Sequence, residues 1–401
     1  MEKNIIQDDE VIDLLKNLIH INSENPPGNE RQIAQFVGKF LMDCGLEVTY
    51  YEPGRNRVSV VGTLKGTKAG PRLILNGHLD TKPAVPPYPT EERWSTDPFV
   101  PTLMDGKLYG VGACDMKGGI AALLSALKAF SAAGHKEMAG EIIFQGAADE
   151  EGGSTLGTEY LLEKGVAGDM AIVAEATSMK ICPAELGALW FTIRIKGERG
   201  HASMPWSKVN AIDKTVEVIA GLKEYIKAKQ ERMKHRYFPR HPSLNLGIIS
   251  GGFHPGVIPD ACTLTFDIRL LPGENRGSVR KEIEGYMEAL VKQDPQLHLS
   301  YEYFKSGGAD PSEINDHHAL VEMIADSYRE VMGTEAELAG FIGFSDAGLL
   351  VNVGKIPTTI FGPGNVQQAH SINEYVSIKD VCTASRIYLK TMHAILCGKK
   401  Q

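Results

Sequence analysis

The chain has 401 residues, of which 43% are hydrophobic and 23% are charged; the length predicts two domains, and the composition is ordinary for a globular protein. Its formal net charge of −8 argues against binding to nucleic acid or to an anionic membrane. Residues 1–19 lack the apolar core of a signal peptide, and no later run is apolar enough to span a bilayer. The six cysteines are scattered and include no Cys-x-x-Cys pair. We therefore expect a cytoplasmic protein with reduced thiols.

The first part of the chain predicts helices followed by strands. Apolar residues recur with helical spacing over 9–20 and 29–45, and Gly45 suits the C-cap of the second helix. Strands are expected at 47–52, 57–64 and 72–77. The last of these contains a continuous apolar run, which is typical of a strand buried on both faces.

Helices and strands alternate in the following segment. One helix is expected from Lys117 to about Phe130, and another from its N-cap Ser154 to Lys164. Apolar runs predict buried strands at 141–148 and 170–174. This alternation predicts an α/β sheet with functional residues at the C-terminal ends of its strands.

Near Leu186 the pattern changes. The expected elements are, in chain order, strand 189–196, turn 197–205, helix 210–229, strands 244–250 and 261–270, helix 276–292 and strand 297–304. This β-α-β-β-α-β order is that of a ferredoxin-like module. Residues 187–304 are therefore predicted to form a domain inserted into a first domain made of residues 1–186 and 305–401. Helix 315–332, a turn at 345–348, strand 357–361 and helix 377–395 would complete the first domain.

The segment Gly77-His78-Leu79-Asp80 follows the apolar run Leu73-Ile74-Leu75. In a functional interpretation His78 is a metal ligand, and the Asp80 carboxylate orients its imidazole. The alternative is a surface turn after a core strand.

Asp115 lies in a stretch with four glycines, Gly110, Gly112, Gly118 and Gly119, which permit unusual backbone geometry and close approach. A carboxylate there can bridge two cations through its two oxygens. A helix N-cap is the simpler alternative. A phosphate-binding loop is the other functional interpretation, but the spacing matches neither common glycine fingerprint.

Three more sites carry acids or histidine at strand ends and in loops: the pair Glu150-Glu151, Glu175 and His370. One acid of the pair can bind metal while its neighbour takes the proton of an activated water. Each site alone also fits a solvated turn or a surface loop. Together with His78 and Asp115 they supply imidazole and carboxylate ligands that suit two zinc ions, plus one spare carboxylate.

Among the remaining histidines, His201 stands out. It lies in Gly200-His201-Ala202-Ser203, a predicted turn of the inserted domain, where an accessible imidazole could stabilise a developing oxyanion. His254 stays open, and the others are expected to have no role in the site.

On these motifs the chain resembles the acetylornithine deacetylase, succinyl-diaminopimelate desuccinylase and glutamate carboxypeptidase family of di-zinc amidohydrolases, over nearly its whole length. The resemblance implies a three-layer α/β zinc-hydrolase catalytic domain with an inserted ferredoxin-like α+β dimerisation, or lid, domain. It implies that Asp115 bridges the metals and that Glu150 is the general base. It assigns His78 and Glu175 to the first zinc, and Glu151 and His370 to the second.

The resemblance also implies roles for the inserted domain. That domain would form a homodimer and bring His201 to the active site of the partner, and Arg269 would contact a substrate carboxylate. The chain departs from the family at Gly256, where relatives commonly carry an asparagine before Val257-Ile258-Pro259. This departure puts the substrate in doubt, but it does not affect the metal chemistry.

The function predicted from the sequence is metal-dependent hydrolysis of the amide bond of a small N-acyl amino acid. Two Zn²⁺ per chain are expected, and Co²⁺ and Mn²⁺ are alternatives, because metal availability decides among them. The first alternative function is a carboxypeptidase or dipeptidase on the same site. The second, from another class, is an inactive dimeric metal-binding scaffold, against which the spare Glu150 argues.

Overall fold

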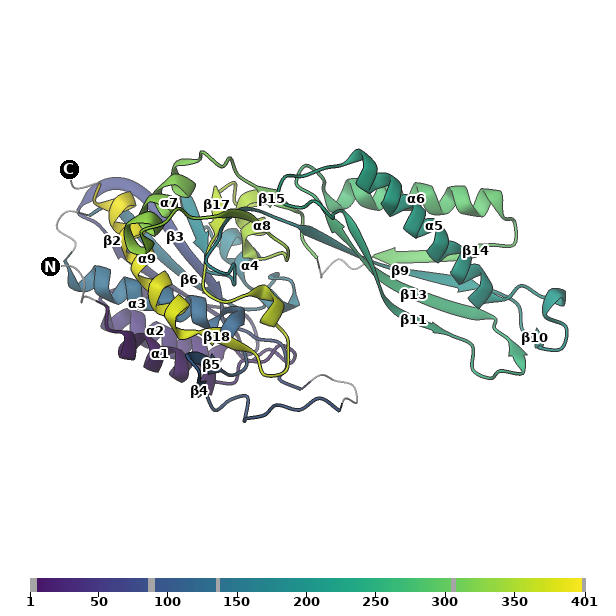
Figure 1. The fold of residues 1–401 in the computed structure, drawn as a ribbon, viewed down its shortest axis with the longest axis horizontal. Helices are drawn as coiled ribbons and strands as arrows, with labels where there is room; N and C mark the ends of the chain where they lie inside the picture. The colour runs from purple at the N-terminus through teal and green to yellow at the C-terminus, as the bar shows by residue number, and fades with distance from the viewer. Residues whose placement is uncertain (1–5, 86–90, 135–137, 304–307, 399–401) are drawn as a thin grey trace. The chain divides into compact units, whose positions relative to one another are not determined.

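The computed structural model describes residues 6–85, 91–134, 138–303 and 308–398 (Figure 1). The chain divides into two compact units, one made of Met1–Ala184 and Glu313–Gln401 and the other of Glu185–Ser312. The sequence prediction put the first boundary after residue 186. Its second boundary, between residues 304 and 305, lies outside the described residues.

The larger unit is built on a mixed sheet of nine strands. Eight of them have the order β1-β2-β6-β3-β7-β17-β8-β15, and β16 pairs with β8. The strands are β1 (Glu47–Gly54), β2 (Arg57–Lys65), β3 (Lys68–His78), β6 (Ala139–Ala147), β7 (Met170–Val173), β8 (Ile181–Glu185), β15 (Ser312–Glu313), β16 (Leu338–Phe341) and β17 (Thr358–Ile360). The central strands β6, β3, β7 and β17 run parallel.

A layer of helices covers each face of this sheet. Alternate residues of a strand point to opposite faces, and here both faces are apolar. Leu73 and Leu75 of β3 pack in one apolar cluster, whereas Ile74 between them packs in another. The first cluster includes residues of α1 (Asp8–His20), α2 (Arg31–Asp43), α3 (Gly118–Ala132), α7 (Ala319–Met332) and α9 (Ile378–Leu396). The second includes residues of α4 (Thr158–Glu163) and α8 (Asp346–Asn352). This three-layer α/β arrangement confirms the predicted fold class.

The smaller unit has a four-stranded antiparallel sheet and two helices. Its strand order is β11-β13-β9-β14. Its main elements are β9 (Gly187–Lys196), α5 (Ala211–Arg232), β11 (Ser243–Gly251), β13 (Ala261–Leu270), α6 (Arg276–Gln293) and β14 (His298–Tyr303). One apolar cluster joins both helices to the sheet. The β-α-β-β-α-β order and the pairing are those of a ferredoxin-like unit, as the sequence predicted.

The structure differs from the prediction around residue 154. The expected helix from Ser154 begins only at Thr158, and its N-cap is Gly157. Ser154 has a left-handed φ of 60°, so it cannot begin a helix there. A Cβ at Gly157 would lie 1.8 Å from the carbonyl oxygen of Ala148, so close packing against the end of β6 determines this turn.

Short elements are the main features that the sequence prediction missed. Besides β8, β15 and β16 these are β4 (Thr102–Met104), β5 (Lys107–Tyr109), β10 (Gly200–His201), β12 (Val257–Ile258), β18 (Tyr375–Ser377) and helix α8. Ser345, expected in a turn, is the N-cap of α8 and accepts a hydrogen bond from the Ala347 N–H. Within the described parts of the chain, no helix has the length and apolarity needed to cross a membrane.

Candidate metal centre and active site

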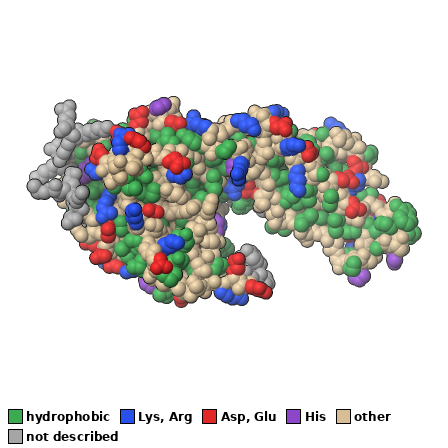
Figure 2. Space-filling view, viewed as in Figure 1, with side chains coloured by type: hydrophobic (Ala, Val, Ile, Leu, Met, Phe, Trp, Pro, Cys, Tyr) green, Lys and Arg blue, Asp and Glu red, His purple; other side chains and the backbone are tan. Residues whose placement is uncertain are grey.

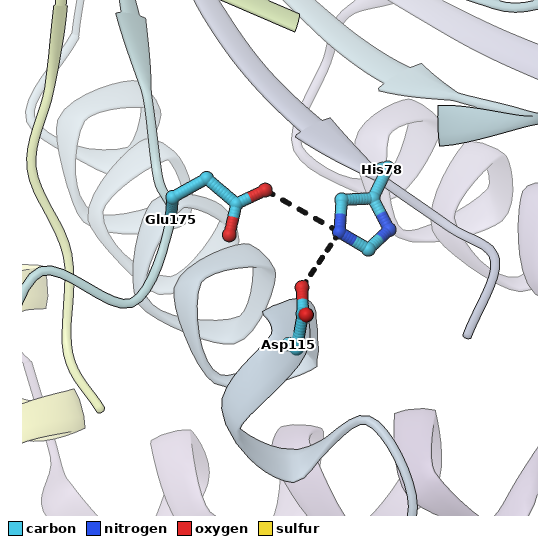
Figure 3. Close-up of side chains that lie close together, drawn as sticks. All are labelled: His78, Asp115 and Glu175. Carbon is cyan, nitrogen blue, oxygen red and sulfur yellow. Dashed lines mark hydrogen bonds and ion pairs between the residues drawn. The ribbon is translucent and has the colours of Figure 1, made fainter. Parts of the chain in front are cut away.

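His78 is the last residue of β3 and is buried. Its Nδ1 lies 2.8 Å from the backbone oxygen of Asp80, and because a carbonyl only accepts, Nδ1 carries the proton. In the neutral ring, the form that binds a metal, Nε2 then carries the lone pair. It lies 2.9 Å from Asp115 Oδ1 and 3.4 Å from Glu175 Oε1 (Figure 3). The imidazole is therefore oriented to bind a cation through Nε2.

The Asp80 carboxylate does something other than the sequence predicted. Its Oδ1 is 3.7 Å from His78 Nδ1, too far for a hydrogen bond, and the backbone carbonyl orients the imidazole instead. The two carboxylate oxygens accept the N–H groups of Glu150 and Glu151 at 3.1 and 3.0 Å. Asn25 Nδ2 donates a further bond at 2.8 Å. Asp80 thus holds the turn that carries the acidic pair.

The two oxygens of Asp115 face two different imidazoles. Oδ1 faces His78, and Oδ2 lies 3.2 Å from His370 Nε2. The same His370 nitrogen lies 3.0 Å from Glu151 Oε1. The described residues therefore contain two ligand groups that share Asp115, namely His78, Asp115 and Glu175, and Asp115, Glu151 and His370. In each group the ligand atoms lie within 4.8 Å of one another, and this donor set fits two adjacent divalent cations.

Glu150 belongs to neither ligand group. It is buried, and its Oε2 lies 3.9 Å from His78 Nε2. A carboxylate beside the cluster but outside both groups is available for proton transfer.

Buried acids and imidazoles share protons in this cluster. Burial raises the pKa of Glu150 well above its usual range, and burial and the Asp115 charge raise the pKa of Glu175 to about 7. Burial opposes protonation of His370, but hydrogen bonds to Asp115 and Glu151 outweigh it and raise its pKa to about 10. The clustered negative charge thus favours bound protons, and divalent cations would compensate the same charge.

Several residues around the cluster were missed from the sequence. Lys82 Nζ lies 3.1 Å from Glu151 Oε2, and the only local signal for it is its place just after Asp80-Thr81. Arg57 Nη2 contacts Asp149 Oδ1 at 2.6 Å and Asn25 Oδ1 at 2.9 Å. These contacts join segments far apart in the chain, so no local pattern indicates them.

The other two predicted site residues, His201 and Arg269, belong to the smaller unit. His201 on β10 is exposed, with Nδ1 2.8 Å from Ser203 Oγ. Arg269 on β13 pairs with Asp267 at 3.0 Å, and the Trp190 Nε1–H donates to the same carboxylate at 2.7 Å. The roles of both residues stay predictions. At the departure from the family pattern, His254 Nδ1 accepts the Gly256 N–H at 3.0 Å.

Comparison with known proteins gives consistent matches over most of the chain. The model of peptidase family M20/M25/M40 matches residues 74–394. The N-formyl-4-amino-5-aminomethyl-2-methylpyrimidine deformylase of Bacillus subtilis (strain 168) is 31% identical over 98% of this chain and 96% of its own. The acetylornithine deacetylase of Pectobacterium carotovorum is 31% identical over 84% of this chain and 83% of its own.

Among solved structures, an M20 family metallo-carboxypeptidase from Sulfolobus solfataricus has a TM-score of 0.77 at 17% identity, with 96% of this chain and 98% of that chain covered. This likeness supports the fold alone. The family model and the curated relatives confirm the resemblance inferred from the motifs. The chain belongs to peptidase family M20/M25/M40, whose members are metal-dependent hydrolases of amide and peptide bonds.

Proposed function

We propose that this enzyme is a deacylase with a dinuclear metal centre that removes a small acyl group from an amine nitrogen. The observation that carries the proposal is the position of Asp115 between two ligand groups, with Glu150 beside them and outside both. A scaffold protein would have no use for the spare carboxylate.

In the proposed reaction His78 and Glu175 would hold one ion, Glu151 and His370 would hold the other, and Asp115 would contribute a ligand to each. When bound, such ions lower the pKa of water and polarise an acyl carbonyl. Glu150 accepts the proton of the attacking water and later delivers it to the leaving amine. Asp80 keeps Glu150 and Glu151 in place through their N–H groups.

The substrate class is proposed from the curated relatives and the departure at Gly256. One relative is named a deformylase and another a deacetylase, and both act on nitrogen bearing a small acyl group. We therefore favour formyl, acetyl or succinyl derivatives of amino acids and related amines. Arg269 would contact a substrate carboxylate, while Gly256 lacks the side-chain amide that relatives commonly offer there.

We also propose that the smaller unit forms a homodimer and that His201 acts in the partner's active site. Strand β11 lies at the edge of its sheet, and Ile248 and Ile249 on it are 64% and 55% exposed. Figure 2 shows hydrophobic side chains gathered over the end of this unit near β10. Trp206, 82% exposed, and Phe253, 68% exposed, belong to the same unit. Exposed apolar edges of this kind are typical of association surfaces. The proposed location of the dimer is the cytoplasm.

A hydrolysis screen tests the substrate class. Enzyme reconstituted with Zn²⁺ or Co²⁺ is assayed with N-formyl, N-acetyl and N-succinyl amino acids, an N-formyl aromatic amine, and dipeptides. We expect the highest kcat/KM for one of the acyl substrates, and a kcat lower by about 10²- to 10⁴-fold in Glu150→Gln. A higher kcat/KM for dipeptides would contradict the proposal and favour a peptidase.

A further inference from the structure

Glu374 is a buried acid, 3% exposed, that directly precedes β18 and follows His370 by four residues. Its Oε1 accepts the N–H groups of Cys114 and Asp115 at 2.8 and 3.0 Å. Its Oε2 accepts the Gly112 N–H at 3.1 Å. Three N–H groups of the turn that carries Asp115 therefore converge on one carboxylate.

The shape of the turn explains this convergence. Gly112 has a left-handed φ of 72°, and the turn that follows points successive N–H groups to the same side. Such a concavity suits a group rich in acceptors, and here the carboxyl group of Glu374 occupies it. Backbone contacts reinforce this link. The Gly110 N–H donates to the backbone carbonyl oxygen of Glu374 at 3.1 Å, and Tyr375 of β18 pairs with Tyr109 of β5.

Glu374 thus joins two segments that supply site residues and are far apart in the sequence. One segment carries Asp115, and the other carries His370. The separation between Asp115 Oδ2 and His370 Nε2, 3.2 Å, depends on how these segments are held together. We propose that Glu374 is a positioning residue that directs the Asp115 carboxylate so that each of its oxygens faces one metal ion. The inference rests on the dinuclear centre proposed above, and Glu374 itself belongs to neither ligand group.

The contact requires two acceptor oxygens. Both oxygens of the Glu374 side chain accept here, because all three partners are donors. In Glu374→Gln one oxygen is replaced by an NH₂ group, which points a donor at a backbone N–H and leaves at least one of the three bonds unmade. Glu374→Asp keeps both acceptor oxygens but is one methylene shorter, so it should restore part of the contact.

A matched control is available in the smaller unit. Glu274 is also buried in its side chain, and its Oε2 accepts the Leu271 N–H at 2.8 Å. It also pairs with Lys229 at 2.6 Å, and none of these residues belongs to a ligand group. Glu274→Gln therefore removes a comparable buried carboxylate without disturbing the Asp115 turn.

The test is a calorimetric titration of chelator-treated protein with Co²⁺, followed by the visible absorption spectrum of the loaded protein. In Glu374→Gln we expect the Kd of at least one ion to rise about 10- to 100-fold, the usual range for lost partners of metal ligands, and the spectrum to change. Glu374→Asp should lie between this variant and the wild type. Glu274→Gln should keep wild-type affinity and spectrum, whatever happens to its thermal stability.

Two results would overturn the inference: wild-type affinity and spectrum in Glu374→Gln, or an equal loss in Glu274→Gln. If Glu374→Gln does not fold, Glu374→Asp decides, and wild-type binding by it would likewise overturn the inference. If the wild-type protein itself takes up fewer than two ions per chain, the proposed centre fails instead. The wild-type titration thus separates failure of the proposed function from failure of this inference.

Discussion

At the scale of single residues, the adjacent acids Glu150 and Glu151 have different surroundings. Glu151 faces His370 and Lys82 and belongs to a ligand group, whereas Glu150 lies beside His78 and belongs to none. Both N–H groups bind the same Asp80 carboxylate, so the backbone of the pair is held while the two side chains diverge. This divergence fits the proposed roles, in which Glu151 binds metal and Glu150 moves a proton.

The first prediction separates these two roles. Glu150→Gln should keep near-wild-type metal content and lose about 10²- to 10⁴-fold in kcat, the range for lost general acid–base catalysis. Glu151→Gln should lose metal as well as activity. Metal analysis and steady-state kinetics on both variants decide the matter. Loss of metal in Glu150→Gln would show that Glu150 is a ligand.

The second prediction concerns Glu30, which shares the Arg57 guanidinium with Asp149. Burial, and then the Asp80 charge, raise the pKa of Glu30 from 4.5 to about 7, although Arg57 opposes the shift. The folded state therefore binds this proton more tightly than the unfolded state does. The stabilisation that the bound proton gives to the folded state is fully present below about pH 4.5 and is lost as the pH rises through about 7.

Glu30→Gln stays neutral, so raising the pH from 4.5 to 8 should favour this variant over wild type by on the order of 3 kcal/mol, at about 1.4 kcal/mol per pKa unit. Urea unfolding of both proteins across this pH range measures the difference. If the difference in unfolding free energy between the two proteins stays constant from pH 4.5 to 8, the pKa of Glu30 is not raised.

At the scale of secondary structure, the site is formed where the parallel strands β3, β6 and β7 end side by side. His78 pairs with Ala147, and Asn76 with Val173, so the segments that carry His78, Glu150 and Glu175 leave the sheet at one edge. Helix α3 packs directly against this edge. A Cβ at Gly119 would lie 1.9 Å from the oxygen of Ala174, the residue before Glu175.

The third prediction follows from this contact. Gly119→Ala should destabilise the protein by about 1–3 kcal/mol or more through overpacking, and should weaken metal binding because the Glu175 backbone must move. Gly285→Ala is the control, since its Cβ would meet no atom within 4 Å, and it should gain about 0.5–1 kcal/mol in the helix α6. Thermal unfolding and metal titration measure both. Equal stability of the two variants would contradict the account of this edge.

The strands that form this edge were predictable because each is a continuous apolar run followed by polar residues, as in Leu73–Leu75 before His78. The three-residue strands β4, β5 and β18 were not, since so short a segment has no period to detect. Asn25, Arg57, Lys82 and Glu374 were missed for a related reason. Their contacts are tertiary, and only the folded chain shows that three N–H groups of the Asp115 turn converge on Glu374.

At the scale of the whole molecule, the two units divide the proposed work. Every residue of the two ligand groups lies in the larger unit, whereas His201 and Arg269 lie in the smaller one. In the proposed dimer each active site combines the metals and Glu150 of one subunit with His201 of the other. The imidazole would act mainly on the oxyanion of the transition state.

The fourth prediction tests this division. His201→Ala should lower kcat by about 10²- to 10³-fold and change KM less. Mixed dimers of His201→Ala and Glu150→Ala subunits should regain part of the activity, because one of their two sites has both intact residues. The assay is the activity of subunit-exchanged mixtures beside each variant alone. If exchanged mixtures stay as inactive as the variants, His201 does not act across the dimer.

The central claim is that catalysis needs two ions held around Asp115. It is tested most directly by titrating chelator-treated enzyme with Zn²⁺ or Co²⁺ while measuring bound metal and hydrolysis of an N-acyl substrate together. The account predicts that activity reaches its maximum near two ions per chain. It also predicts that Asp115→Asn, which cannot offer two anionic oxygens, fails to hold the pair. Full activity with a single ion per chain, or activity independent of metal, would contradict it.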